Sequence, residues 1–118
     1  MKQNLPFLKH ILDEIIFLLS ETKRLTYEDF ISNELLKRGC ARSIEVIGEA
    51  VKNISNDLKN KHKEIEWRKM AGMRDKIIHY YFGVNWDIVW DVIQKIIPEL
   101  KPKIETIINK LERNKREK

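Results

Sequence analysis

The residues best suited to chemistry lie together in segment 73–81, which contains Arg74, Asp75 and His79. An arginine is a permanent cation that binds phosphate oxygens, and an imidazole exchanges protons near neutral pH. A neighbouring carboxylate can orient that imidazole. Two tyrosines, Tyr80 and Tyr81, follow the histidine directly. These groups could bind a phosphodiester and cleave it by general acid and base catalysis.

The apolar spacing of this segment predicts one amphipathic helix over residues 70–81. Its apolar residues recur every three or four positions and fall on one side of a helical wheel. Asp75 and His79 fall on the opposite side, four residues apart, where the carboxylate can accept a hydrogen bond from the imidazole. Arg74 lies about 140° around the wheel from His79. It therefore reaches the histidine only through its long side chain, or from a second molecule.

A second apolar strip, formed by Ile78 and Phe82, lies near the Asp75 and His79 side of this predicted helix. An isolated chain would have to expose that strip, which favours a partner at the same surface. If the partner is a second copy of the chain, a two-fold axis would bring two arginines and two histidines into one cleft. One imidazole could then act as base and the other as acid.

The whole chain predicts an all-α fold, an antiparallel bundle of four to five helices, because alternating strand patterns are not evident. Thr26 and Asn85 are expected to cap helix starts, and Gly48 and Ala50 to permit close helix approach. Pro98 fits the first turn of a last helix. The first helix is expected to begin at residue 4 and to end between 22 and 25, and the next two to cover 27–54 and 66–81. A further helix begins at 86, and a last one runs from Pro98 through 111. Residues 56–63 are expected to form a loop.

One compact domain over residues 1–118 is expected, with 112–118 a charged and frayed tail. Cys40 is the single cysteine, so an intrachain disulfide is excluded. Apolar runs of roughly 18 residues and a signal-peptide pattern are both missing, which predicts a cytoplasmic protein without a membrane partner. The formal net charge of +5 is compatible with a polyanionic partner.

With these residues in view, the chain resembles the HepT family of the HEPN superfamily, the toxin half of bacterial and archaeal toxin–antitoxin pairs. The HEPN signature is an arginine, usually followed by a polar residue, and a histidine after four to six intervening positions. Arg74, Asp75 and His79 fit it with four intervening residues, and Tyr81 completes the His-x-Tyr extension of HepT. The similarity covers about the whole chain, because further matching segments lie in the family's order at 44–50, 67, 72–75 and 89–90.

The resemblance implies a HEPN-like homodimer that acts as a metal-independent endoribonuclease, with its active site at the dimer interface. Arg74 would hold the scissile phosphate and His79 would move protons at the ribose 2′-hydroxyl or the leaving 5′-oxygen. Asp75 would orient His79. A metal or other cofactor is not implied, because the 2′-hydroxyl is an internal nucleophile.

The same resemblance implies the toxin of a type VII toxin–antitoxin system with a nucleotidyltransferase antitoxin, MntA, as its partner. Tyr81 resembles the tyrosine that such an antitoxin modifies with AMP. A bulky anionic adduct beside Arg74 and His79 would keep RNA out of the cleft and occupy the cation.

A function from another class stays open, since Arg74 and Asp75 could be an ordinary exposed charged pair. The chain would then be a non-catalytic helical module that dimerises and binds a nucleotide or a nucleotidyltransferase partner. RNA cleavage would be absent in that case.

Two further groups of residues have chemical potential but simpler explanations. His10, Asp13 and Glu14 have spacing that could hold a metal, yet a solvated polar face of the first helix explains them more simply. Glu45 and Glu49, four residues apart, are also explained by a polar helix face. Their place in a segment that resembles HepT leaves open a role in supporting the Arg74 side chain.

Overall fold

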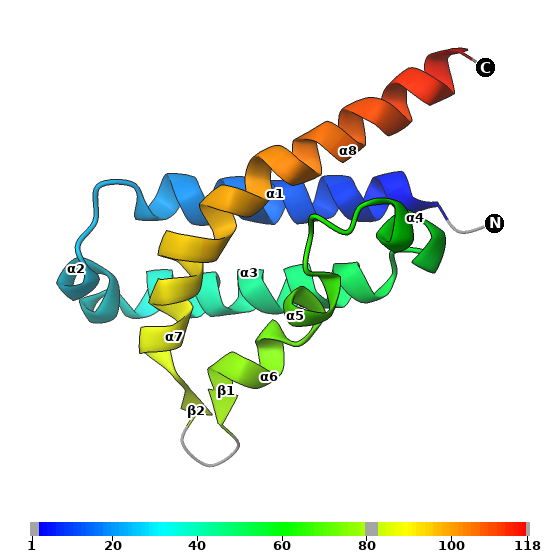
Figure 1. Cartoon of the computed structure of the whole chain (residues 1–118). Helices are drawn as coiled ribbons and strands as arrows, with labels where there is room; N and C mark the ends of the chain where they lie inside the picture. Colours follow the sequence, from blue (N-terminus) through cyan, green and yellow to red (C-terminus); the bar gives the residue numbers. More distant parts are fainter. Residues whose placement is uncertain (1–2, 80–82, 118) are drawn as a thin grey trace.

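A computed structural model confirms the predicted all-α antiparallel bundle. The structure describes residues 3–79 and 83–117, except for the side chains of 79, 116 and 117. Two long helices, α1 and α3, lie side by side in opposite directions, and α8 packs on α1 (Figure 1). The elements are α1 (Asn4–Thr22), α2 (Tyr27–Ser32), α3 (Glu34–Lys52), α4 (Asn56–Lys61), α5 (Trp67–Ala71), α6 (Met73–Ile77), β1 (Ile78–His79), β2 (Gly83–Val84), α7 (Trp86–Asp91), a π-helical turn (Val92–Ile96) and α8 (Ile97–Glu117).

Hydrogen-bonding caps set the helix starts that the sequence predicted. Thr26 and Asp29 form a reciprocal capping box at α2, with each side chain accepting a hydrogen bond from the other residue's backbone N–H. Asn85 Oδ1 accepts from Ile88 N at 3.2 Å and starts α7. The expected continuous helix over 27–54 is wrong, because Asn33 ends α2 and its side chain caps the start of α3.

A further difference is α4, which occupies most of the segment expected to be a loop. Ser55 caps α4 by accepting from Leu58 N at 3.2 Å, and Leu58 is buried in the core. Asn4 at the start of α1 binds Ser55 in turn, since Ser55 N donates to Asn4 Oδ1 at 2.8 Å. A helix of six residues with a single buried anchor has too few apolar positions to show a helical period in the sequence.

The C-terminal part of the chain continues through both prolines as a helix. The chain passes from α7 to α8 through the π-helical turn, where Ile97 N–H donates to the Val92 carbonyl five residues earlier. Pro98 and Pro102 have no N–H to donate, so the hydrogen-bond pattern changes near them. The prolines therefore shift the hydrogen-bond pattern of the helix without ending it. The helix α8 extends past the rest of the bundle (Figure 1).

The core lies between α1, α3 and α8 and is mainly isoleucine and leucine, including Ile15, Ile44 and Ile104. Gly48 on α3 meets α5 closely, as the sequence predicted. A Cβ atom there would lie 3.3 Å from the Met70 carbonyl oxygen and 3.4 Å from that of Ala71. The close approach fixes α5 on α3 and hence the start of the segment that carries Arg74. No helix among the described residues is long and apolar enough to cross a membrane.

Two glycines of α3 should respond oppositely to the same substitution. Gly39→Ala should raise the free energy of unfolding by about 1 kcal/mol, because the new methyl makes an ordinary 3.6 Å contact with Phe17 and alanine favours the helix. Gly48→Ala should lower it by about 1 kcal/mol, because crowding of rigid backbone carbonyls outweighs that gain. Urea unfolding followed by circular dichroism measures both, and equal stabilisation would contradict the tight α3 to α5 contact.

Cys40 should be nearly inert in the folded protein. Its side chain is fully buried, and burial raises the pKa of its thiol to about 11. At pH 8 only about one such thiol in a thousand would be ionised, and the thiolate is the reactive form. A colorimetric disulfide reagent should therefore modify Cys40 rapidly in denaturant and at least about 100-fold more slowly without it. Equal rates would show that α3 opens readily at this position.

Candidate functional site

The segment with the candidate catalytic residues is divided into two short helices and a β-hairpin. Gly72 separates α5 from α6, and α6 ends at Ile77. The backbone then pairs antiparallel, with Ile78 opposite Val84 and His79 opposite Gly83. The single helix predicted over 70–81 is therefore wrong.

Local sequence explains why the helix stops there. Two β-branched residues, Ile77 and Ile78, favour an extended chain, and Gly83 takes a positive φ of 76° that few other residues adopt. Asn85 N–H donates to the Ile77 carbonyl at 2.6 Å and closes the base of the hairpin. The hairpin projects from the bundle below α6 (Figure 1).

The hairpin also changes the place of Ile78. The sequence predicted that Ile78 would be exposed beside Phe82. In the structure Ile78 is half-buried, pairs with Val84 and packs against the core. Phe82 lies outside the described residues. The prediction that Ile78 belongs to an exposed apolar strip is therefore wrong, because the change to extended backbone directs this side chain inward.

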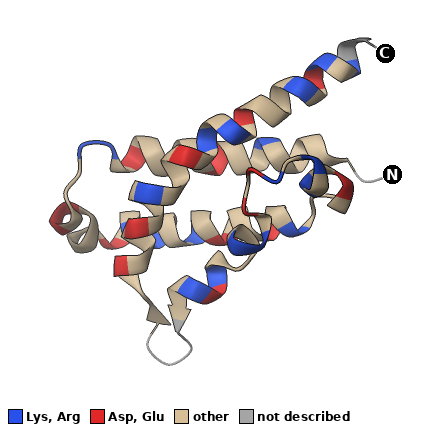
Figure 2. Ribbon diagram, viewed as in Figure 1, with Lys and Arg blue, Asp and Glu red and all other residues tan. Residues whose placement is uncertain are grey.

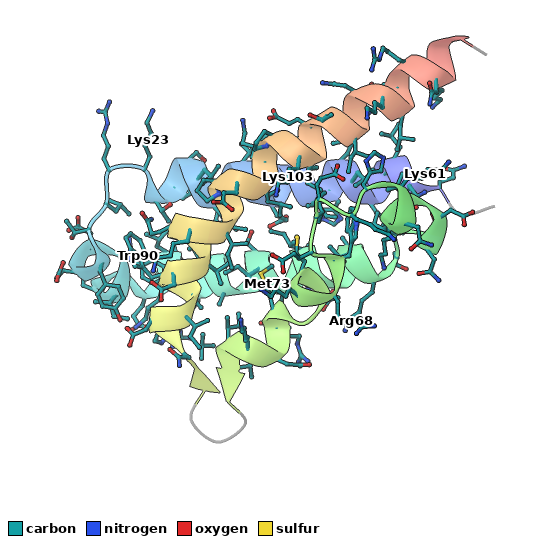
Figure 3. The ribbon with its side chains drawn as sticks, in the orientation of Figure 1. Lys23, Lys61, Arg68, Met73, Trp90 and Lys103 are labelled. Carbon is teal, nitrogen blue, oxygen red and sulfur yellow. The ribbon has the colours of Figure 1, made fainter. Side chains whose placement is uncertain are left out.

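The buried side of α6 agrees with the sequence. Met70, Met73 and Ile77 are all in the core, and Figure 3 shows Met73 on the inner side of the bundle. This packing turns the opposite side of α6 outward. Arg74 and Asp75 are accordingly both exposed.

Arg74 is held by a carboxylate from another helix. Its Nε lies 3.5 Å from Oε2 of Glu45 on α3, and its side chain is 53% exposed. Glu45 is only 19% exposed and also lies 3.5 Å from Arg42 Nη1. Arg42 Nη1 further approaches Glu49 Oε1 at 3.7 Å. Figure 2 shows basic and acidic residues on both α3 and α6.

The other predicted site residues are placed less fully. The backbone of His79 lies in β1, two residues beyond the end of α6, but its side chain and all of Tyr81 lie outside the described residues. The proposed hydrogen bond from His79 to Asp75 stays a prediction. It can no longer rest on the four-residue spacing of a helix, because α6 ends between the two residues.

An aromatic cluster between α2 and α7 supports this region and was not foreseen from the sequence. The ring of Phe30 on α2 lies 5.0 Å from that of Trp90 and 6.3 Å from that of Trp86, measured between centroids. Figure 3 labels Trp90 beside α2. Tyr27 donates a hydrogen bond to the Asp87 carboxylate, which raises the pKa of the Tyr27 hydroxyl. Because α7 follows β2 after one residue, this cluster anchors one strand of the hairpin.

Other groups near the surface do not join Arg74. His10 Nε2 lies 3.9 Å from Glu14 Oε2 on α1, and the described residues contain no group of three side chains suited to a metal. A pocket of about 180 Å³ between α5, α6 and α8 is lined by Met73 and Lys76 but not by Arg74. Lys103, at its rim, donates to the Glu64 carbonyl at 3.1 Å.

Comparison with known proteins assigns the family. The profile of the ribonuclease HepT-like family matches residues 11–107. A protein of Caldanaerobacter subterraneus subsp. tengcongensis with a provisional RNase name is 48% identical over 89 residues, which covers 75% of this chain and 80% of the relative. A protein of Methanocaldococcus jannaschii with a similar name is 44% identical over 106 residues, or 90% and 88% of the two chains.

A third relative carries the family name itself. The protein of Thermococcus cleftensis named "Probable ribonuclease HepT" is 46% identical over 79 residues, which covers 67% of this chain and 72% of that one. No solved structure matches significantly. The chain belongs to the HepT-like ribonuclease family, as its resemblance in sequence indicated.

Proposed function

We propose that this protein is a metal-independent endoribonuclease whose catalytic residues are Arg74 and His79, with Asp75 orienting His79. The observation that carries the proposal is the placement of Arg74. The chain belongs to a ribonuclease family, and Arg74 lies five residues before the histidine of the motif. The Arg74 side chain is exposed to solvent yet held by Glu45. A held and accessible guanidinium is suited to binding a phosphodiester.

The reaction follows from the groups present. His79 takes the proton of the ribose 2′-hydroxyl, and the 2′-oxygen attacks the adjacent phosphorus. Arg74 stabilises the charge on the non-bridging oxygens as the bond to the 5′-oxygen breaks. A second imidazole gives a proton to that leaving oxygen. The products are a 2′,3′-cyclic phosphate and a 5′-hydroxyl. DNA should not react, because it lacks the attacking 2′-hydroxyl.

The second imidazole motivates a homodimer. One His79 cannot be both base and acid in the same step, whereas a two-fold axis beside the hairpin would bring two copies of it to one scissile bond. We therefore include in the proposal an active site composed of residues from both protomers. The proposal also has the protein act in the cytoplasm, where it would meet its RNA substrate.

The proposal extends to control of the enzyme. As the toxin of a type VII toxin–antitoxin system, the protein would be silenced when an MntA-like nucleotidyltransferase attaches AMP to Tyr81. This residue lies between β1 and β2 in the sequence, two positions after His79. A phosphate there would compete with RNA for the guanidinium of Arg74.

Intact-mass analysis after co-expression with the partner tests this control. The parent should gain the mass of one adenylyl group per modified chain, and its ribonuclease activity should fall as that fraction rises. Tyr81→Phe should stay unmodified, while Tyr80→Phe should be modified like the parent. Unchanged modification of Tyr81→Phe would place the acceptor at another residue.

A non-catalytic module for nucleotide or partner binding is the competing function. It would keep the fold, the dimer and binding to the nucleotidyltransferase, but RNA would not be cut. Cleavage by the purified, unmodified protein separates the two functions.

A further inference from the structure

Two guanidinium groups share a single carboxylate oxygen in the described structure. Arg42 reaches Glu45 Oε2 from the same helix, α3, and Arg74 reaches it from α6, each at 3.5 Å. The two arginines are far apart in sequence but adjacent at this oxygen. The Arg-to-His motif contains only the second of them.

The three side chains differ in burial in a way that suits a binding site. Glu45 is 19% exposed, whereas Arg74 and Arg42 are 53% and 62% exposed. The carboxylate is thus screened from water by the groups around it, which strengthens its hold on both cations. More than half of each arginine side chain stays exposed, so an anion can approach both from solvent.

Glu45 also links a short helix to a long one. α6 has five residues, too few to be stable alone, and it is followed at once by the hairpin. α3 has nineteen residues and packs on α1, α5 and α6. A carboxylate on α3 therefore fixes the direction of Arg74 better than any group on α6 itself.

We propose that Arg42, Glu45 and Arg74 form one binding site for the RNA backbone, in which Arg42 binds a phosphate next to the scissile one. Glu45 is the positioning residue that holds both guanidinium groups. Arg74 binds the scissile phosphate. This inference rests on the proposed ribonuclease function and extends its site from α6 onto α3.

Glu49 occupies part of this site in the absence of RNA. Its Oε1 lies 3.7 Å from Arg42 Nη1, and its side chain is 56% exposed. An exposed pair of this kind contributes little free energy, so a phosphate can displace it. Glu49 thus competes with RNA for Arg42, whereas Glu45 supports the site.

A matched pair of substitutions distinguishes these two roles. Glu45→Gln and Glu49→Gln each remove one negative charge from the same helix, so a general effect of charge would strengthen RNA binding equally in both. We expect Glu49→Gln to lower the Kd for RNA about threefold, because it no longer competes for Arg42. Glu45→Gln should instead lower kcat at least about tenfold, because Arg74 loses its position. Equal kcat in both variants would overturn the positioning role.

A second pair tests Arg42 itself. Arg38 lies one turn earlier on α3, is 77% exposed and pairs with Glu34, so it is a matched control that does not touch Glu45. Binding of a fully 2′-O-methylated RNA, which cannot be cut, is measured against salt concentration. Arg42→Ala should raise the Kd and reduce the slope of log K against log salt by about 0.7, the value for one phosphate of a single strand. Arg38→Ala should change neither.

The possible failures are distinguishable. If the parent cleaves RNA while Arg42→Ala and Arg38→Ala bind alike, the extended site is wrong and the ribonuclease function stands. If the parent binds the methylated RNA through Arg42 but cuts no RNA, the proposed function fails while the binding site stands. Circular dichroism of each variant confirms that any loss is not unfolding.

Discussion

Alanine at Arg74 or at His79 should lower kcat/KM for RNA cleavage by about 1000-fold, which is the usual scale for loss of an oxyanion-binding cation or a general acid and base. Arg74→Ala removes the charge that stabilises the transition state, and His79→Ala removes the group that moves protons. The double variant should be little worse than either single one, since the residues act in one step. Single-turnover cleavage of a defined RNA in the presence of chelator measures all three.

Lys76→Ala is the control for this experiment. Lys76 is an exposed cation on the same short helix as Arg74, but it lines the pocket on the side of Met73. Its removal should change kcat/KM by only a few fold through the general electrostatic attraction of RNA. If Lys76→Ala were as inactive as Arg74→Ala, the loss would reflect the charge of α6 rather than a specific guanidinium at the site.

Phe30→Ala should lower the free energy of unfolding by about 3–5 kcal/mol, the range for removal of a buried aromatic ring. The Phe30 side chain is fully buried and its ring lies among those of Tyr27, Trp86 and Trp90. Its removal leaves a cavity between α2 and α7 and takes away three aromatic contacts. Urea unfolding followed by circular dichroism measures the loss.

Leu35→Ala provides the comparison, because Leu35 is a large apolar residue that is 85% exposed at the start of α3. Its replacement should change the free energy of unfolding by no more than about 0.5 kcal/mol. A loss below about 1 kcal/mol for Phe30→Ala would mean that the aromatic cluster does not hold α2 and α7 together.

Much of the fold could be predicted because long helices and their caps leave strong local signals. The apolar stripe of α1 and the hydroxyl and amide caps at Thr26 and Asn85 required no knowledge of the tertiary structure. Asn33 was missed because one residue ends α2 and starts α3, which leaves the apolar period on both sides almost unbroken.

The hairpin could not be predicted from the period of the apolar residues. Its strands have two residues each, too few to show alternation, and Met73 and Ile77 satisfy a helical spacing up to the point where the helix ends. A positive φ at Gly83 and the hydrogen bond from Asn85 to Ile77 depend on chain reversal, which the sequence signals only weakly.

The candidate site was predictable in its residue types and less so in its geometry. The helical wheel placed Asp75 opposite the apolar residues, and Asp75 is exposed. It placed Arg74 about 140° away from His79, and the Arg74 side chain is exposed as well. The sequence left the role of Glu45 open, because contact between α3 and α6 depends on tertiary packing. That contact, at 3.5 Å from Arg74 Nε, joins the arginine of the motif to the long helix α3.

The central claim is internal attack by the ribose 2′-hydroxyl, and cleavage of one pair of oligonucleotides tests it most directly. One is an RNA that the unmodified protein cuts at a mapped position, and the other differs only by 2′-deoxyribose immediately before the cut. With chelator present, the RNA should yield a 2′,3′-cyclic phosphate end, and the substituted strand should stay intact at that position. Cleavage of the substituted strand at the same bond, or loss of all activity in chelator, would contradict the account.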